Sequence, residues 1–457
     1  MRELLRKSAR YFLIVALAGL ALRLLFILRF ESITTDSFIY GDIAKNWLRY
    51  GVYGITDNGI LVPTFIRLPG YPAFLALIFT IFGMEHYRAV LFVQMFVDLG
   101  TCLIIADMAR RTISPCAAKA AFLLAAVCPF LANYVATALT ETLEIFFTVL
   151  ALDFAIAGME GLSERRIFPW LGCGLAVAAA ILLRPDGGLL LIAIGIYLLM
   201  MLIRAKADKR VHLTVVTMIV AGLSIAPLVP WALRNLHTIH RFQPLAPRYA
   251  NEENEFVPQG FNRWVKTWMV DYASVEEIYW PVPGSAIEGE KLPARAFDSE
   301  QQHQETLELV DDYNHVLHFD GDLDGRFARL AEERIHHAPL RYYVWLPFLR
   351  VADMWLRPRT ELLPSDTRWW EFDDDPRWSA LAVVVGAINL LYVAASFIGL
   401  IRWRSIAYAG LLLIFVALRS AFLGSLENPE PRYTLECYPI VILLASLLWS
   451  RYSTEHS

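Results

Sequence analysis

Residues 168–203 read FPWLGCGLAVAAAILL, then RPDGG, then LLLIAIGIYLLMMLI, so a short polar turn separates two long apolar runs. Each run approaches the length of about 17–20 apolar residues that a helix needs to cross a bilayer. The turn begins with Arg184 and contains Asp186. Two runs of this kind, back to back, are typical of a protein that crosses a membrane more than once.

The composition of the whole chain agrees with this interpretation. Hydrophobic residues make up 56% of the 457 residues, charged residues make up 19%, and the mean hydropathy is +0.44. A soluble globular chain has about 25% charged residues. This excludes the alternative that the length would otherwise suggest, which is a chain of three soluble domains. We therefore predict an all-α polytopic membrane protein.

The charge and the cysteines exclude further classes. The net charge is −4, and no basic block indicates a surface for nucleic acid. The five cysteines lie in or beside apolar runs, so the sequence predicts neither a disulfide framework nor a zinc site.

Ten apolar runs are long enough to predict about ten spanning helices. They lie near residues 11–29, 87–108, 116–134, 137–157, 168–183, 187–203, 212–233, 379–400, 405–424 and 434–450. The first is too long for the core of a signal peptide and has no convincing cleavage site, so we expect a retained span. A shorter run at 70–83 follows LPGYP and predicts a re-entrant or interfacial helix in the first outer loop.

The basic residues give an orientation for these spans. Placing the N-terminus inside puts most arginine and lysine residues of the short loops inside, as in the pairs Arg110–Arg111 and Arg165–Arg166. The short outer turns then carry only Arg184 and Arg432. This is the positive-inside bias. We expect both termini in the cytoplasm, and counting 70–83 as a span would destroy the pattern.

Two outer segments are long, and they divide the chain into three predicted parts. Residues 1–234 form an N-terminal membrane module that includes the first outer loop, 30–86. Residues 235–378 form a large outer loop, and residues 379–457 form the C-terminal membrane helices. The large loop holds eight of the thirteen tryptophans, so we expect a mixed, folded extramembrane domain that rests on the membrane interface.

Ionisable groups at membrane level are costly, so each one is a candidate functional residue. Asp36 follows the first span, and Tyr40 lies one helical turn later on the same face. The structural alternative is that Asp36 only caps this helix. Arg67 precedes a rigid Pro-Gly turn, where it could bind a lipid phosphate or extend to headgroups without a specific partner.

Further charged residues fall on the same predicted side. Glu141 and Glu144 share one helix face, where a cap and an interhelical hydrogen bond are the structural alternatives. Asp186 is a possible structural partner of Arg184. The other outer candidates are Arg234, Glu427 and Arg432.

Asp98, near the middle of the second span, is the most expensive single charge in the chain. The sequence offers Arg23 in the first span as a structural partner, and a proton relay is the alternative. The outer charges together suit a substrate that is itself a lipid phosphate.

The order of several short motifs resembles a known family. They are Asp36-x-x-x-Tyr40-x-x-Ile43-Ala44, RLPGYP at 67–72, Thr140-Glu141, LRP at 183–185, PWxxRN at 230–235 and Arg432-Tyr433. Together they resemble the multispanning GT-C glycosyltransferases, and above all the protein O-mannosyltransferases and lipid A aminoarabinose transferases. The similarity covers about residues 10–240 and 380–450, and residues 250–375 match nothing of use.

The resemblance implies a fold and a chemistry. The family takes a sugar from a polyprenyl-phosphate donor and inverts the anomeric centre, with an outer-loop carboxylate as base. Carried over, Asp36 would be that base, and Arg67 would face the lipid phosphate. Arg234 would be a second phosphate ligand. Glu141 would help to hold the acceptor or the sugar.

Other expectations complete the sequence-based prediction. Tyr40, Arg184, Glu427 and Arg432 are further candidates for substrate or lipid-phosphate binding. Many relatives have two adjacent acidic residues at the first-loop site, whereas Ser37 follows Asp36 here. Asp42 could serve as the second carboxylate, although it lies about 120° away on a helix. We therefore expect no required metal, although a divalent metal is possible.

The expected partners are the lipid donor, a glycan, lipid or protein acceptor, and the bilayer. The expected location is a bacterial inner membrane, with the active site on the periplasmic or extracellular side. A lipid-linked glycan polymerase or ligase is the alternative enzyme. A transporter or flippase for lipid-linked sugars is the alternative of another class, although the paired halves typical of transporters are not apparent.

Overall fold

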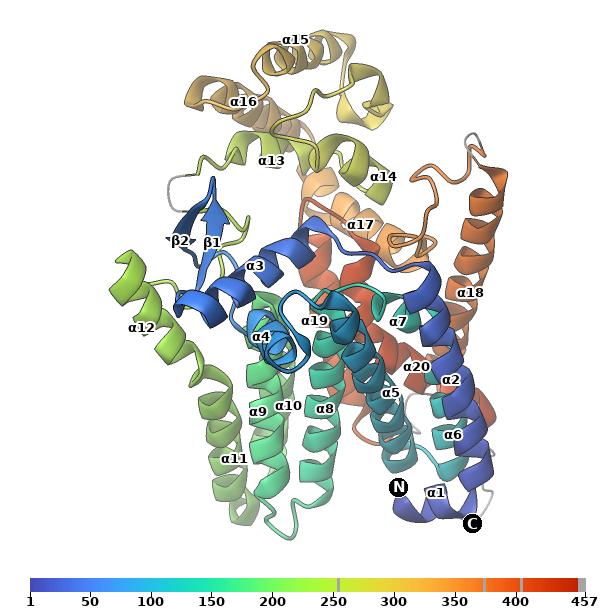
Figure 1. Ribbon diagram of the computed structural model, residues 1–457. Helices are drawn as coiled ribbons and strands as arrows, with labels where there is room; N and C mark the ends of the chain where they lie inside the picture. The colour runs from blue at the N-terminus through green and yellow to red at the C-terminus, as the bar shows by residue number, and fades with distance from the viewer. Residues whose placement is uncertain (253–254, 373–374, 403–405, 451–457) are drawn as a thin grey trace. The chain divides into compact units, whose positions relative to one another are not determined.

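The computed structural model describes residues 1–252, 255–372, 375–402 and 406–450, and these residues are mostly helical (Figure 1). They form two compact units. The first unit comprises the described residues within 1–252, 392–416 and 435–457, and the second comprises those within 253–391 and 417–434. The domain boundaries that we predicted from the sequence, at 234 and 378, divide the chain differently, and they stay predictions.

Seven segments of the described residues are long and apolar enough to cross a membrane. They are α2 (Ala9–Arg29), α5 (Tyr87–Thr112), α8 (Glu141–Glu160), η1 with α10 (Pro185–Arg204), α11 with α12 (Ala207–Ile239), α18 (Pro376–Ile401) and η7, α20 and η8 (Pro431–Trp449). Shorter apolar helices occupy the other predicted spans, and they are α6 (Pro115–Ala126), α9 (Phe168–Leu183) and α19 (Ala409–Gly424). The prediction of an all-α polytopic membrane protein is confirmed.

Two predicted spans are each broken into two helices, and proline marks both breaks. The run at 116–134 becomes α6 and α7 (Pro129–Tyr134), and the run at 212–233 becomes α11 (Ala207–Ile225) and α12 (Leu228–Ile239). Pro129 and Pro227 stand at these junctions. Proline has no backbone N–H and clashes with the preceding turn, so it ends a helix or begins a new one.

The helices of the first unit pack against one another through a series of pairwise contacts. Helix α5 contacts α6 and α8, α8 contacts α9, and α9 contacts α11. Figure 1 shows α8, α9 and α11 running side by side. A short helix, α1 (Arg2–Lys7), precedes α2.

The first outer loop has its own secondary structure. It contains α3 (Thr35–Tyr50), the antiparallel strands β1 (Gly54–Asp57) and β2 (Ile60–Pro63), and α4 (Gly70–Phe82). Asn58 and Gly59 both have positive φ, as a two-residue hairpin turn requires. Helix α4 is the short helix predicted at 70–83, and its depth in the bilayer stays a prediction.

The buried charge in the second predicted span has the expected partner. Arg23 donates from Nε to Asp98 Oδ2 at 2.6 Å, and the two side chains are 0% and 3% exposed. Arg23 also donates to the carbonyls of Gly19 and Ala126. The guanidinium is thus neutralised and hydrogen-bonded, which is what makes a buried ion pair tolerable. The predicted pairing of Asp98 with Arg23 is confirmed.

The second unit contains most of the large outer loop. Its helices are α13 (Gln259–Val265), α14 (Tyr272–Ser274), η2 (Val275–Tyr279), η3 (Gly289–Lys291), η4 (Ala294–Ala296), α15 (Glu300–Val316), α16 (Gly321–His337), η5 (Arg341–Trp345) and α17 (Leu346–Leu356). Phe261, Trp264, Trp268 and Phe327 are buried in its core. The described part of this loop is helical and has no strand, unlike the mixed domain that we expected.

Candidate functional site

Helix α3 begins with a cap that does not involve Asp36. The N-cap is Thr34, whose hydroxyl accepts from the Ser37 N–H, and Ser37 Oγ in turn accepts from the Thr34 N–H. This reciprocal pair is a capping box. The alternative that Asp36 is the N-cap is therefore wrong. Ser37, the residue that follows Asp36, thus serves this cap.

Asp36 instead contacts Arg67 from the other end of the first outer loop. Arg67 Nη2 donates to Asp36 Oδ1 at 2.7 Å. The Arg67 guanidinium also lies over the Tyr40 ring, 5.5 Å from its centroid. The Asp36 side chain remains 38% exposed, whereas that of Arg67 is 17% exposed. The carboxylate is thus held in place and still open to a substrate.

The protonation states of Tyr40 and Arg67 at neutral pH suit the binding of a phosphate anion. Burial raises the pKa of Tyr40 to about 12, with Arg67 acting in the opposite direction. Tyr40 is therefore a neutral hydroxyl at pH 7. Burial lowers the pKa of Arg67, but Tyr40 and Asp36 outweigh that effect and leave the pKa above its ordinary value. Arg67 therefore keeps its positive charge.

A second group of charges surrounds Arg184. Its guanidinium lies 3.5 Å from Glu141, 3.6 Å from Glu144 and 3.2 Å from Asp186. Both glutamates are almost fully buried at the start of α8, while Arg184 is 20% exposed. Thr140 holds the N-cap position of α8 and Glu141 is its first residue. Arg184 thus has the expected partner in Asp186, and it also faces two buried carboxylates.

The two groups lie in the same region of the first unit. Arg184 and Glu141 are close enough to affect the pKa of Tyr40, the first by lowering it and the second by raising it, although burial has the largest effect. Gly70 begins α4 beside the end of α9, and a Cβ there would lie 2.6 Å from the Leu182 carbonyl oxygen. A glycine is therefore required where the LPGYP turn passes α9. The structure brings Asp36, Tyr40, Arg67, Glu141 and Arg184 together in this way.

Arg234 has a different environment. Its guanidinium donates to the backbone carbonyls of Tyr53 and Thr64, and it lies 5.3 Å from the ring centroids of Tyr53 and Trp231. Tyr53 in turn donates from its hydroxyl to the Arg67 carbonyl at 3.0 Å. Arg234 therefore supports the backbone that carries Arg67. Its predicted contact with phosphate stays a prediction.

Glu427 and Arg432 belong to the second unit. Arg432 Nε lies 2.5 Å from Glu430 Oε2, and the guanidinium lies 5.3 Å from the Tyr433 ring centroid. Glu427 is buried, with 4% exposure. Their predicted roles in substrate binding stay predictions.

Asp42 does not provide a second carboxylate next to Asp36. It accepts from the Thr56 N–H at 2.6 Å and from Asn46 at 3.2 Å, which ties α3 to β1. Lys45 is also 3.1 Å from Asp42. Among the described residues, no group of three or more histidine, cysteine or acidic side chains could hold a metal. The need for a metal is not tested by this observation and stays a prediction.

Two residues that support the site, Tyr71 and Gln94, were given no role of their own in the sequence analysis. Tyr71 packs edge-on against Tyr40, with ring centroids 5.0 Å apart, and donates to Gln94 Oε1 at 2.8 Å. Gln94 donates to the Thr137 carbonyl at 2.8 Å. The available signal was Gln94 itself, because a buried amide four residues before Asp98 in an apolar span needs a partner.

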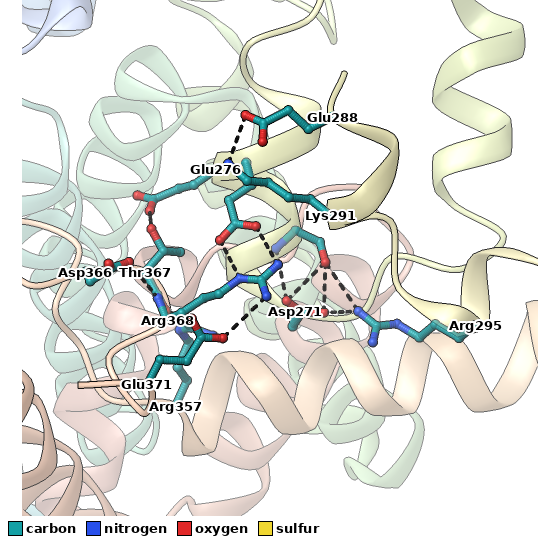
Figure 2. Close-up of polar contacts among 12 residues, drawn as sticks. Asp271, Glu276, Glu288, Lys291, Arg295, Arg357, Asp366, Thr367, Arg368 and Glu371 are labelled. Carbon is teal, nitrogen blue, oxygen red and sulfur yellow. Dashed lines mark hydrogen bonds and ion pairs between the residues drawn. The ribbon is translucent and has the colours of Figure 1, made fainter. Parts of the chain in front are cut away.

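The second unit has its own polar cluster beside a cavity of about 700 Å³. Figure 2 shows that Arg295 points to Asp271, and that Arg368 lies between carboxylates and contacts Glu371. Arg368 also binds Glu277 through two hydrogen bonds of 2.8 Å. These basic groups already have acidic partners, so we interpret this cluster as a link between the segment near 368 and the helices at 271–279.

Comparison with known proteins places this geometry in context. Residues 63–231 match a family model described as dolichyl-phosphate-mannose-protein mannosyltransferase. This range includes Arg67, Glu141 and Arg184. No curated protein sequence matches the chain.

Solved structures extend the similarity along the whole chain. An oligosaccharyltransferase, AglB from Archaeoglobus fulgidus, in complex with an inhibitory peptide and a dolichol-phosphate, is similar over 96% of this chain and 50% of its own, with 14% identity and a TM-score of 0.51. ArnT from Cupriavidus metallidurans, bound to undecaprenyl phosphate, is similar over 94% and 78% of the two chains, with 13% identity and a TM-score of 0.44. The present chain thus spans about half the length of AglB.

At such low identity the AglB similarity supports the fold alone, and the family model covers residues 63–231, which include three of the candidate site residues. The chain is a polytopic membrane protein with a fold similar to that of AglB, and its segment 63–231 is similar to the mannosyltransferase family model.

Proposed function

We propose that this protein is a glycosyltransferase that moves a sugar from a polyprenyl-phosphate donor to an acceptor at the outer face of the membrane. The observation that carries the proposal is the pair of Asp36 and Arg67. It combines an accessible carboxylate with a cation that stays charged. A base for the acceptor and a positive charge for the leaving phosphate are the two groups that such a transfer needs.

The reaction uses these groups as follows. The acceptor hydroxyl gives its proton to Asp36 while its oxygen attacks the anomeric carbon. The bond from that carbon to the phosphate oxygen breaks on the opposite face, so the anomeric centre is inverted. The electron pair of this bond goes to the phosphate, which leaves as an anion and needs no proton from an acid.

Arg67 acts on that leaving group. Its guanidinium donates to Asp36. A lipid phosphate competes for the same forked donors, since arginine binds phosphate and carboxylate in similar geometry. Charge that develops on the phosphate is stabilised by Arg67, which is electrostatic catalysis.

The remaining candidates bind or position substrate. Tyr40 offers a neutral hydroxyl beside the Asp36–Arg67 pair. Glu141 and Arg184 hold polar groups of the acceptor or sugar, because they lie near Tyr40. Arg234 keeps the Arg67 segment in place. Substrate or lipid-phosphate binding by Glu427 and Arg432 is also part of the proposal, and it rests on the sequence resemblance.

The donor class has support from outside the site. The matching family is described by a dolichyl-phosphate sugar, and AglB was solved with a dolichol-phosphate. For the location we propose a bacterial inner membrane, with cytoplasmic termini and an outer active site. That orientation follows the positive-inside bias. The reaction as written needs no metal.

The test is transfer activity in purified membranes with labelled polyprenyl-phosphate sugars, using the wild type and Asp36→Asn. Transfer that depends on Asp36 supports the proposal. If the protein instead moves labelled donor lipid across a proteoliposome without releasing sugar, it is a transporter and the proposal fails. If only preassembled oligosaccharides are transferred, the enzyme is a ligase or polymerase.

A further inference from the structure

The segment that forms η5 and α17 in the second unit has an unusually apolar exposed face. Residues 341–356 are continuously helical, so positions four apart lie on one side. Seven large apolar side chains of this region are at least 44% exposed. They are Leu340, Tyr343, Val344, Trp345, Phe348, Leu349 and Leu356. Leu349 and Leu356 line the cavity of the second unit. We call the other five residues the α17 apolar face.

The opposite side of the same helix is packed into the second unit. Leu346, Arg350 and Met354 are buried, and they lie about 200° around the helix from Val344, Phe348 and Ala352. The Arg350 guanidinium donates to the Met269 carbonyl at 2.9 Å and to the Gly424 carbonyl at 3.2 Å. A charged residue therefore points inward while aromatic and aliphatic residues point outward. In water this is the reverse of the usual pattern.

Helix α17 lies beside helices that belong to the membrane. Trp355 Nε1 donates to Ser420 in α19 at 3.2 Å, and its carbonyl accepts from Asn389 in α18 at 2.9 Å. A Cβ on Gly424, the last residue of α19, would lie 2.8 Å from the Pro347 carbonyl oxygen. Helix α18 is a candidate span, and α19 is one of the shorter apolar helices. These contacts place the C-terminal part of α17 beside the middle of α18, at Asn389, and beside the end of α19, at Ser420 and Gly424.

The chemistry of the face fits the boundary between lipid and water. Tyr343 and Trp345 lie at its N-terminal end, and tryptophan and tyrosine are enriched at membrane interfaces. At the same end, Arg341 is held by Asp298 through hydrogen bonds of 2.6 and 2.8 Å. The face itself has no charged member. Apolar area of this extent is normally covered in a stable protein.

From these observations we propose that the α17 apolar face inserts into the outer leaflet of the bilayer and anchors the large loop to lipid. The occupant of the face is the acyl and interfacial region of the membrane. The inference concerns attachment of the loop rather than the transfer reaction, and it stands whether or not the proposed function is correct. It sharpens the expectation of a membrane-resting loop by assigning the contact to one helix face.

The experiment measures which solvent surrounds Phe348. The exposed Cys116 is changed by Cys116→Ser, and Phe348→Cys is then labelled with a bimane dye in the full-length protein. The protein is reconstituted into phosphatidylcholine vesicles, and quenching by a spin-labelled phosphatidylcholine is compared with quenching by aqueous iodide. The matched control is Glu308→Cys, because Glu308 is an exposed polar position on α15 of the same unit.

The expected result is strong quenching by the lipid and several-fold weaker quenching by iodide at Phe348, with the opposite order at Glu308. The same labelling at Val344→Cys repeats the test if the Phe348 variant does not fold. Iodide quenching as strong as at Glu308 would show that the face is in water and overturn the proposal. Protection from both quenchers would show that protein covers the face, and this also overturns it.

Discussion

Arg67 Nη2 lies 2.7 Å from Asp36 Oδ1 and so joins the first turn of α3 to the segment just before α4, 31 residues later in the chain. Both segments belong to the first outer loop, and both are fixed independently of the ion pair. Thr34 and Ser37 cap α3, while Gly70 packs against α9. The pair is therefore held by its surroundings, and removing one partner need not unfold the loop.

The first prediction tests whether Asp36 acts as a base in the reaction or only stabilises the start of α3. Asp36→Asn keeps the shape of the side chain and removes the base, so transfer should fall by at least about 100-fold. Expression and thermal stability should stay near those of the wild type, because Asp36 makes no cap bond. Thr34→Ala is the matched control and should cost about 1 kcal/mol of stability while transfer activity is largely kept. If Asp36→Asn loses enough stability to account for its loss of transfer, the assignment of Asp36 as the base is contradicted.

Arg67 carries the second prediction, which concerns the donor. Arg67→Ala removes a charge-assisted contact worth about 1.5–3 kcal/mol, so binding of a polyprenyl phosphate should weaken by about 10- to 100-fold. Arg67→Lys keeps the charge without the forked donors of arginine, so its affinity for the polyprenyl phosphate should lie between those of the wild type and Arg67→Ala. Binding can be measured by thermal shift against polyprenyl-phosphate concentration. An unchanged affinity in Arg67→Ala would remove Arg67 from the phosphate site.

The sequence predicted the membrane helices and some contacts among the candidate residues because both depend on local signals. Long apolar runs identify spans without knowledge of tertiary contacts. The pairing of Asp98 with Arg23 was also predictable, since a buried charge must be neutralised and few opposite charges lie at the same depth. The Asp36–Tyr40 spacing is one helical turn, so their common face followed from α-helical geometry.

Other features depended on contacts that periodicity does not report. The capping role passed from Asp36 to Thr34 because the helix began two residues earlier than an N-cap at Asp36 would have placed it. The contact between Asp36 and Arg67 required the β1–β2 hairpin to turn the chain back, and we did not predict that hairpin. The role of Arg234 as a support for Tyr53 and Thr64 followed only from the three-dimensional structure.

That role leads to the third prediction. Arg234→Ala should free the carbonyls of Tyr53 and Thr64 and loosen the segment that carries Arg67. Hydrogen exchange in residues 53–68 should then rise, and donor affinity should fall together with it. Arg234→Lys restores the charge but not the geometry, so it should not rescue the exchange pattern. If donor binding weakens while exchange is unchanged, Arg234 contacts the phosphate directly instead.

A fourth prediction tests the buried pair between α2 and α5. Asp98→Asn leaves the Arg23 charge almost fully buried without its counter-charge, which should destabilise the fold by about 3–5 kcal/mol. A double variant, Arg23→Met with Asp98→Leu, removes both charges and should recover much of that loss. Unfolding by denaturant in detergent measures both effects. Wild-type stability in Asp98→Asn would favour a protonated Asp98 and hence the proton-relay alternative.

The fifth prediction concerns the pH dependence of the second unit. Burial raises the pKa of Asp298, but the hydrogen bonds from Arg341 and the charge of Arg334 outweigh this effect and hold the pKa below its ordinary value. A carboxyl group with a depressed folded-state pKa stabilises the fold above its unfolded pKa of about 4, and this contribution is lost as the pH falls through the folded value. The second unit should therefore lose stability below about pH 4.

Asp298→Asn tests the cause. The variant should be less stable than the wild type at pH 7, and the difference should shrink as the pH falls toward 3, because the wild-type carboxyl is then protonated. Hydrogen exchange in α16, corrected for intrinsic pH effects, measures this. The exposed Asp311 makes Asp311→Asn a suitable control, and it should change little at either pH. A stability difference that stays constant with pH would assign the effect of Asp298→Asn to altered packing and not to the charge.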